Sequence, residues 1–268
     1  MRLFFALCGS KLQPVIRIPY NITVIKLQRF FVPRIDGVLP DTIVHQILHV
    51  LRLKENDCVI LLDNSGKEHT AKLCAYDKGM KKNQVLPHYK VIETHENAYE
   101  PSVRVTLSLA LLKSQERFEW AVQKATELGI SAIRPLITER TQVKNLRNIE
   151  RLRRIMQEAS EQCERGIIPT LLPVKKFEEL TEDAEKETGR TIVFCHELSQ
   201  SVFNTFPPLA EEIEIVIGPE GGFSEKESEL ITHTVKTTSH VHSISLGKRI
   251  LRAETAAVTA LSLILPHY

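Results

Sequence analysis

Two glycine-containing stretches in the last third of the chain hold the residue types that can bind a ligand. Residues 217–224 read IGPEGGFS and residues 245–255 read SLGKRILRAET. Glycine lets backbone approach a ligand closely. The first stretch lacks the residue order of a phosphate-binding loop, and Glu220 inside it would repel a phosphate. One such loop can be shaped by packing alone, but the second loop makes a binding site for a ligand without phosphates the better interpretation.

Charged residues stand directly before the most apolar segment of the chain. Residues 253–265 are apolar on nearly every side, as is typical of a helix buried all round. Lys248, Arg249, Arg252 and Glu254 lie at its beginning. Charges next to a buried element need partners or solvent, which indicates a candidate site.

The residues before position 96 predict a small all-β unit. Residues 29–32 resemble a strand, and Asp41 is expected to cap a short helix. Three further strands are expected at 58–62, 68–73 and 85–92, the first two on either side of a turn at 63–66. We interpret residues 27–95 as a small barrel and place a linker at 96–102.

From residue 103 the pattern changes to alternating strands and helices, which predicts an α/β domain with a parallel sheet over 103–268. Three helices are expected in this domain. The first spans 116–128 and is ended by Gly129, and the second begins after Asn148, its expected cap. The third begins after Ser224, which forms a capping box with Glu227. The expected strands are 103–109, 133–137, 191–195, 213–217 and 241–244.

The composition narrows the class of protein. The chain has 268 residues and a net charge of +2, and its five cysteines show no paired spacing. Reduced thiols in a cytoplasmic protein are therefore expected, and the ten histidines show no ligand spacing, so we predict no metal. The apolar run after Met1 is short and is interrupted by Lys11, so we expect a soluble protein without a signal peptide. Residues 1–26 form an extension of unknown role.

Basic residues gather in one region, and this pattern is equally typical of a face that binds a polyanion and of a merely solvated helix face. Under the family resemblance described below, that polyanion is RNA. The candidates for RNA contacts are Arg140, Lys144, Arg147, Arg151, Arg154 and Arg165, with Arg29, Arg34 and Arg52 from the N-terminal unit.

Five motifs in order along the chain resemble the ribosomal RNA small-subunit methyltransferase E family. They are KATELG at 124–129, PLITER at 135–140, ASEQCER at 159–165 followed by Pro169, IGPEGGFS at 217–224, and SLGKRILRAET at 245–255. His45, residues 50–54 (VLRLK) and Asp57 also resemble the N-terminal part of that family. The sequence departs from the family at Gln46, where a second histidine is usual, at Asn56, where glycine is usual, and in residues 1–26.

The resemblance implies a PUA-like RNA-binding barrel followed by a SPOUT-type domain with a C-terminal trefoil knot. It implies a homodimer that uses S-adenosylmethionine to methylate N3 of uridine 1498 in 16S ribosomal RNA. Two alternatives stay open at this point: a non-catalytic RNA-binding or ribosome-assembly factor, and a SPOUT enzyme that acts on transfer RNA.

Carried onto this sequence, the resemblance implies the site residues. The expected cofactor-binding residues are Cys195, His196, Glu197, Ile217, Gly218, Pro219, Glu220, Gly221, Gly222, Leu246, Gly247, Ile250, Leu251 and Thr255. Arg252, which never deprotonates in proteins, is expected to orient or polarise the uracil. Glu254 is a candidate acid or base, or equally a charge partner of the helix N-terminus. Gln162 and Arg165 would serve either the RNA or a partner subunit's site.

Overall fold

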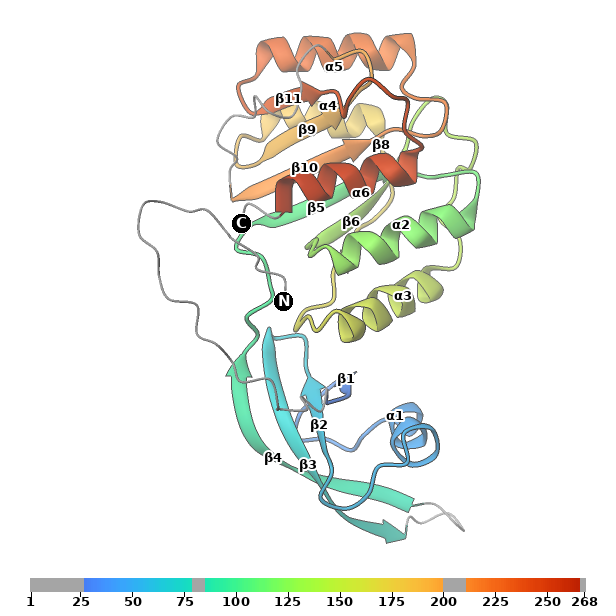
Figure 1. Cartoon of the computed structure of the whole chain (residues 1–268). Helices are drawn as coiled ribbons and strands as arrows, with labels where there is room; N and C mark the ends of the chain where they lie inside the picture. The colour runs from blue at the N-terminus through green and yellow to red at the C-terminus, as the bar shows by residue number, and fades with distance from the viewer. Residues whose placement is uncertain (1–26, 79–84, 200–210, 266–268) are drawn as a thin grey trace, which may run out of the picture.

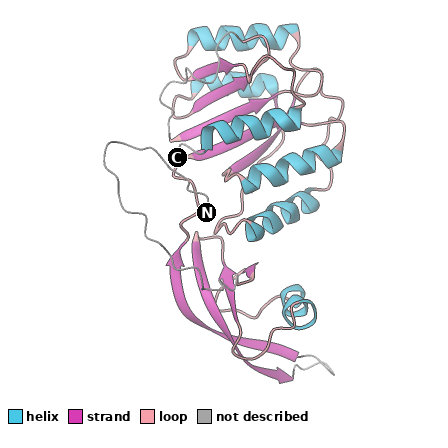
Figure 2. Ribbon diagram, in the orientation of Figure 1, coloured by secondary structure: helices cyan, strands magenta, loops and turns pink. Residues whose placement is uncertain are grey.

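The computed structural model describes residues 27–78, 85–199 and 211–265, and the predicted extension at 1–26 lies outside them. The described chain forms two sheets, one before residue 97 and one after residue 103 (Figure 1). Strands of the second sheet lie between helices, whereas the first sheet carries only a short helical turn (Figure 2).

The N-terminal sheet has the strand order β1-β2-β3-β4. Its strands are β1 (Arg29–Phe31), β2 (Cys58–Leu62), β3 (Lys67–Lys78) and β4 (Val85–Glu96). β1 pairs with β2 in parallel, and the other pairs are antiparallel. The predicted turn between β2 and β3 uses positive φ angles at Asn64 and Gly66, which asparagine and glycine tolerate best.

A short α-helix, α1 (Asp41–His45), continues into the π-helix η1 (Gln46–Val50) and packs Ile43 and Ile47 onto this sheet. The prediction of Asp41 as the cap is wrong by one residue, because Pro40 occupies the N-cap position and Asp41 is the first helical residue. The strands run as an open path in the described residues, so a closed barrel is not shown here.

The C-terminal sheet is parallel throughout and has the order β11-β9-β10-β5-β6-β7, with β8 also paired to β6. Its strands are β5 (Arg104–Ala110), β6 (Ala132–Ile137), β7 (Thr170–Leu171), β8 (Lys175–Lys176), β9 (Thr191–Cys195), β10 (Glu212–Ile217) and β11 (Val241–Ile244). The predicted α/β class with a parallel sheet is confirmed.

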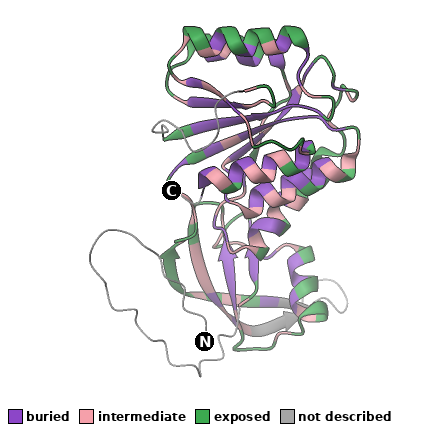
Figure 3. Ribbon diagram, turned by 45° about the horizontal axis from the view of Figure 1, so that its top comes forward, coloured by how far each residue is buried: buried purple, intermediate pink, exposed green. Residues whose placement is uncertain are grey.

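Helices cover both faces of this sheet, and the core lies between them (Figures 1 and 3). On one face lie α2 (Gln115–Glu127), α3 (Ile149–Gln162) and α6 (Ala253–Ile264). On the other face lie α4 (Phe177–Lys186) and α5 (Glu225–Thr237). The apolar strands are buried because helices pack on both of their sides.

Three helix ends show how local sequence sets the boundaries. Gly129 ends α2 at a φ of +101°, as predicted for a glycine after a helix. Ser224 and Glu227 form the predicted capping box of α5. Asn148 is the N-cap of α3 as predicted, but at a φ of 51° and with no hydrogen bond from its side chain to the helix. The strands β7 and β8 have two residues each, too few to show a period, and were not predicted. The helix α4 was also not predicted, although its buried residues Phe177, Leu180, Thr181 and Ala184 follow the helical period.

The strand order reverses direction between β5 and β10. The chain leaves β5 toward β6 on one side, and β10 returns to the other side of β5, with Ile217 opposite Leu109. Open α/β sheets bind ligands outside the carboxyl ends of strands at such a switch point. The topology therefore predicts a ligand site at the loops that follow β5, β9 and β10.

Candidate functional site

A cleft lies at the carboxyl ends of β9 and β10, where α6 begins. Its volume is about 690 Å³ when the solvent at its open mouth is included. Three chain segments form its wall: 195–197, 217–223 and 245–256. The lining residues are Cys195, His196, Glu197, Ile217, Gly218, Pro219, Glu220, Gly222, Phe223, Ser245, Leu246, Gly247, Arg249, Ile250, Leu251, Ala253 and Ala256.

The fold brings together all the residues predicted to bind a cofactor except Gly221 and Thr255. Thr255 is exposed on α6 outside the cleft. Gly221 has a supporting contact instead, since its carbonyl oxygen accepts a hydrogen bond of 2.8 Å from Arg140 Nη1. That these residues bind a cofactor stays a prediction at this stage.

The loop after β10 is held in shape from the neighbouring β6 side. Ser224 Oγ donates to Glu139 Oε2 at 2.7 Å, and the Glu139 backbone N–H donates to Glu227 Oε1 at 2.8 Å. Glu227 also accepts from the Ser224 backbone N–H. The capping box thus fixes the start of α5 and, through Glu139, anchors residues 217–224 to the end of β6.

Glycine is required at two cleft positions. Gly222 has a φ of +67° and Gly247 a φ of +119°, which side chains rarely adopt. A Cβ on Gly247 would meet no atom within 4 Å. The backbone conformation, and not crowding by neighbours, is therefore what demands glycine at Gly247, and the space beside it stays open.

His196 and Cys195 are held by the surrounding structure. His196 Nε2 lies 3.2 Å from Ser228 Oγ of α5, and the ring meets Phe223 edge-on at 5.8 Å. Burial lowers the pKa of His196 below its usual 6.5, and the Glu197 carboxylate partly offsets this. Burial raises the pKa of the Cys195 thiol to about 12, so the thiol stays protonated and is not a nucleophile.

The backbone of His196 is already occupied on both sides. Its N–H donates to the Ile244 carbonyl oxygen at 2.8 Å, and its carbonyl oxygen accepts from the Ser199 N–H at 3.1 Å. The His196 N–H is therefore already used, whereas its carbonyl oxygen keeps a second lone pair for a ligand.

Five lining residues were not among the predicted cofactor-binding residues: Phe223, Ser245, Arg249, Ala253 and Ala256. All of them except Ala256 lie in the two glycine-containing stretches that were predicted to form the site. Ala253 and Ala256 are three residues apart, and this spacing places them on one face of α6. Phe223 packs its ring against Gly218, where a Cβ would lie 3.3 Å from it. The helical spacing of the two alanines could have identified them from the sequence. The contact of Phe223 with Gly218 is visible only in the tertiary structure.

The two predicted catalytic residues do not line the cleft. Arg252 is the exposed N-cap residue of α6, between the lining residues Leu251 and Ala253. Glu254 is buried and lies 3.7 Å from Arg117 Nε of α2, while its Oε2 has no hydrogen-bond partner in the described structure. For Glu254 this geometry favours the role of charge partner over that of acid or base.

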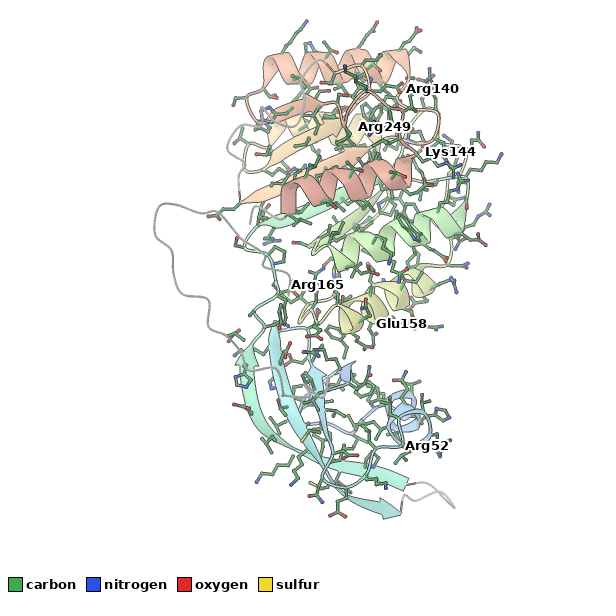
Figure 4. The ribbon with its side chains drawn as sticks, in the orientation of Figure 1. Arg52, Arg140, Lys144, Glu158, Arg165 and Arg249 are labelled. Atoms are coloured by element: carbon green, nitrogen blue, oxygen red, sulfur yellow. The ribbon has the colours of Figure 1, made fainter. Side chains whose placement is uncertain are left out.

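Several of the predicted RNA contacts are exposed. Figure 4 shows Arg140, Lys144 and Arg249 on the side to which the carboxyl ends of the strands point. Arg147, just before α3, and Arg154, within α3, are exposed. Arg151 is also exposed, but its Nε lies 2.8 Å from Glu119 Oε2. Arg34 and Arg52 are exposed in the N-terminal unit. Cations around the cleft would attract a polyanion.

Arg29 and Arg165 are buried and already paired, so we leave them out of the RNA-contact set. Arg165 is only 3% exposed, and its guanidinium bonds Glu100 Oε2 at 2.7 Å and the Thr126 carbonyl oxygen at 3.0 Å. Arg29 bridges to Glu164 at 3.1 Å. The contacts that the structure shows for Arg165 are within its own chain, and a role toward RNA or a partner subunit stays a prediction.

These two arginines belong to a set of contacts between the two sheets, which we call the junction cluster. Asn97 Nδ2 donates to Glu68 Oε1 at 2.7 Å and to the Glu164 carbonyl oxygen at 2.8 Å. The Phe31 backbone N–H donates to Glu161 Oε1 at 3.1 Å. The junction cluster comprises Arg29, Phe31, Asn64, Glu68, Asn97, Glu100, Glu161, Glu164, Arg165, Gly166, Ile167 and Ile168.

The described residues contain no group of three or more histidine, cysteine or acidic side chains arranged to hold a metal ion. Within the same part of the chain, no helix has the length and apolarity that a membrane span requires.

Comparison with known proteins agrees with this geometry. Residues 99–265 match a family model described as an RNA methyltransferase domain. The ribosomal RNA small subunit methyltransferase E of Rickettsia conorii is 34% identical over 224 residues, which cover 82% of this chain and 84% of that protein. The protein of the same name from Bacillus subtilis is 33% identical over 82% of this chain and 86% of its own.

Solved structures are also similar. A ribosomal RNA small subunit methyltransferase E from Neisseria gonorrhoeae, bound to S-adenosyl methionine, has a TM-score of 0.75 and 28% identity, over 90% of this chain and 98% of that one. A putative methyltransferase from Legionella pneumophila, in complex with the same cofactor, has a TM-score of 0.74 and 30% identity over 91% and 98%. The family model and these relatives each match most of the C-terminal domain, which contains the cleft. The chain therefore belongs to the ribosomal RNA small-subunit methyltransferase E family.

Proposed function

We propose that this protein transfers a methyl group from S-adenosylmethionine to N3 of uridine 1498 in 16S ribosomal RNA. The observation that carries the proposal is the cleft at the switch point, where the two glycine loops of the family motifs meet. Family membership supports the reaction, and solved relatives bound to S-adenosylmethionine support the cofactor.

The residues of the cleft fit this cofactor. S-adenosylmethionine has no phosphate, and the Glu220 carboxylate lines the cleft, where a phosphate would be repelled. Glu197 and Arg249 also line it, and they offer opposite charges to the ammonium and carboxylate of a methionine moiety. Ile217, Leu246 and Leu251 supply apolar wall, and the space beside Gly247 is open to a ligand.

When bound, S-adenosylmethionine supplies an electrophilic methyl group. Neutral uracil carries a proton on N3, so N3 becomes a nucleophile only as this proton passes to solvent water at the open mouth of the cleft, and negative charge develops on the flanking oxygens. The N3–methyl bond would form as the bond from sulfur to the methyl carbon breaks, which leaves the neutral thioether S-adenosylhomocysteine. We assign to Arg252 the donation of hydrogen bonds to those oxygens, and its exposed position between the lining residues Leu251 and Ala253 supports this role. The in-line approach of N3 to the methyl carbon depends on this positioning.

The exposed cations Arg140, Lys144 and Arg147 would contact RNA phosphates, with Arg52 contributing from the N-terminal unit. The target base must be unpaired or extruded to enter the cleft. We further propose that residues 27–95 form the PUA-like RNA-binding unit and 103–268 a SPOUT-type domain with a trefoil knot. The proposal includes a homodimer that works in the cytoplasm, where ribosomal RNA is found.

The deciding experiment maps methylated nucleosides by mass spectrometry in 16S ribosomal RNA from a strain that lacks this protein. Loss of N3-methyluridine at position 1498, restored by the wild-type gene, is expected. Persistence of that modification would overturn the proposal. Loss of a modification in transfer RNA instead would point to the related enzyme, and no lost modification would point to a non-catalytic RNA-binding factor.

The role of Arg252 is tested by Arg252→Lys, which keeps the charge but loses the planar fork of donors. A fall in kcat of at least about tenfold is expected, with unchanged affinity for S-adenosylmethionine, since one positioned donor is worth about 10²–10³ in rate in other enzymes. Arg153→Lys, an exposed arginine on α3 paired with Glu150, is the matched control. Native turnover in Arg252→Lys would refute the role.

A further inference from the structure

A second cavity lies beside the cleft, between the beginnings of α2 and α3. With its open mouth it encloses about 350 Å³. Its lining residues are Leu111, Leu112, Lys113, Gln115, Phe118, Val143, Asn145, Leu146, Arg147 and Leu152. Leu111, Leu112, Phe118 and Leu152 are buried and form an apolar floor, and Val143 and Leu146 are half-buried at its sides. The predicted site did not include this cavity.

A hydrogen bond joins the wall of the cavity to the wall of the cleft. Lys113 lines the cavity, and its backbone N–H donates to Glu220 Oε1 at 3.1 Å, while Glu220 lines the cleft. Lys113 follows β5 and Glu220 follows β10, and these two strands are hydrogen-bonded neighbours at the switch point. The walls of the cavity and of the cleft are therefore in contact, as consecutive units of one chain molecule would require.

The rim of the cavity is cationic. Lys113 and Arg147 are both exposed, and in the described part of the chain neither side chain has an ion-pair partner. The nearby acid, Glu119, is occupied, because Arg151 Nε bonds its Oε2 at 2.8 Å and Gln115 Nε2 bonds its Oε1 at 2.8 Å. No acidic residue lines the cavity. The rim is complementary to an anion.

The polar groups at the cavity suit a nucleobase. Asn145 presents an amide group, which can pair with the edge of a base, whereas the Gln115 amide nitrogen already donates to Glu119. The apolar floor offers a surface on which a flat ring can stack, and the two cations at the rim are suitable partners for phosphates on either side of that ring. One nucleotide of a single strand offers all three features together, whereas an apolar protein segment would leave the two cations without partners.

We propose that this cavity binds the base of a nucleotide next to the target uridine, with Lys113 and Arg147 contacting the flanking phosphates. The inference rests on the proposed function, since the cleft must hold the target base. It adds a second recognition point, through which the enzyme selects its uridine by the neighbouring nucleotide and not by the target base alone.

The test uses single-stranded RNA oligonucleotides with the sequence around uridine 1498, in which an abasic ribose replaces each nucleotide in turn. Binding is measured by fluorescence anisotropy with the full-length protein. Wild-type protein is expected to lose about tenfold in affinity at one abasic position beside the target, as for loss of one stacked or buried base. Val143→Phe, which fills the cavity, should bind the intact RNA as weakly as the wild-type protein binds the abasic RNA. The affinity of this variant should change less than twofold when the abasic site is introduced.

Lys113→Ala and Arg147→Ala cover the case in which Val143→Phe does not fold. Each is expected to raise the KM for RNA and to reduce the salt dependence of binding by about 0.7 in the log–log slope, the value for one phosphate contact on a single strand. Affinity for S-adenosylmethionine, measured by calorimetry, should not change. Lys236→Ala on α5 removes one exposed positive charge from the opposite face of the sheet and is the matched control.

The outcomes separate this inference from the proposed function. RNA binding that depends on a neighbouring base but gives no methylation would support the cavity and overturn the enzyme assignment. Methylation that is insensitive to every abasic neighbour and to Val143→Phe would overturn the cavity and leave the enzyme assignment intact. A change in the sedimentation of Val143→Phe, with unchanged RNA binding, would show a contact between copies of the chain and also overturn the inference.

Discussion

Arg165→Ala is expected to lower the free energy of unfolding by about 3 kcal/mol. Arg165 is 3% exposed and makes the central contacts of the junction cluster. Its Nε and Nη2 bond Glu100, and its Nη1 bonds the Thr126 carbonyl oxygen of α2. Because the chain passes from one sheet to the other beside Glu100, this pair sets how the two sheets meet.

The magnitude follows from what the truncation leaves behind. Removing one partner of a buried ion pair costs about 3–5 kcal/mol, because the other charge stays buried without compensation. Here the lower value applies, since the Glu100 side chain is 19% exposed and its Oε1 still accepts from the backbone N–H groups of Gly166 and Ile167 at 3.1 Å each. The Thr126 carbonyl oxygen loses this partner as well.

Urea unfolding followed by the fluorescence of Trp120, the one tryptophan of the chain, measures this loss on α2. Glu100→Gln keeps an acceptor for both N–H groups and is expected to cost less than Arg165→Ala. Arg153→Ala removes an exposed arginine paired with Glu150 and should cost under about 0.5 kcal/mol. A loss below about 1 kcal/mol in Arg165→Ala, with an unchanged m-value, would refute the buried-pair reasoning.

Three further predictions test the junction, the cleft and the pH response. Gly166→Ala should destabilise the protein by about 1–3 kcal/mol in urea unfolding, because a Cβ there would lie 2.9 Å from Asn97 Cβ and 3.2 Å from the Gly66 backbone; stability equal to wild type would contradict the close approach. Gly247→Ala should weaken binding of S-adenosylmethionine about tenfold by calorimetry, since φ of +119° strains alanine by about 1–3 kcal/mol. Gly189→Ala, where a Cβ meets nothing within 4 Å, is the control for both, and an equal effect at Gly189 would count against either explanation. The free energy of unfolding should fall as pH drops below about 6.5, because burial lowers the pKa of His196 and of His242, so that the unfolded chain binds more protons than the folded one; above pH 6.5 this stabilisation is fully present. His196→Gln should flatten part of that slope, and an unchanged slope would show that His196 does not contribute.

The local elements were largely predictable from sequence. The strands of the parallel sheet are short apolar runs between helical periods, and the capping box at Ser224 and Glu227 reports directly where α5 begins. The two glycine loops could also be identified from sequence as candidate ligand-binding loops, because the need for glycine is a property of the local backbone. Asp41 and Asn148 show the limit of this approach, since a polar residue before a helix does not by itself dictate which hydrogen bond it makes.

Contacts between distant segments could not be predicted in this way. Arg165 and Arg140 look alike in the sequence, yet one is buried against Glu100 and the other supports the Gly221 carbonyl at the cleft. The cavity beside Lys113 joins the beginnings of two helices that are more than thirty residues apart. By itself the sequence determined which segments form strands, helices and glycine turns, because those choices depend on neighbours along the chain. Only the tertiary structure decided which charges are buried, which remain free for RNA and which loops share a wall, because burial and pairing depend on neighbours in space.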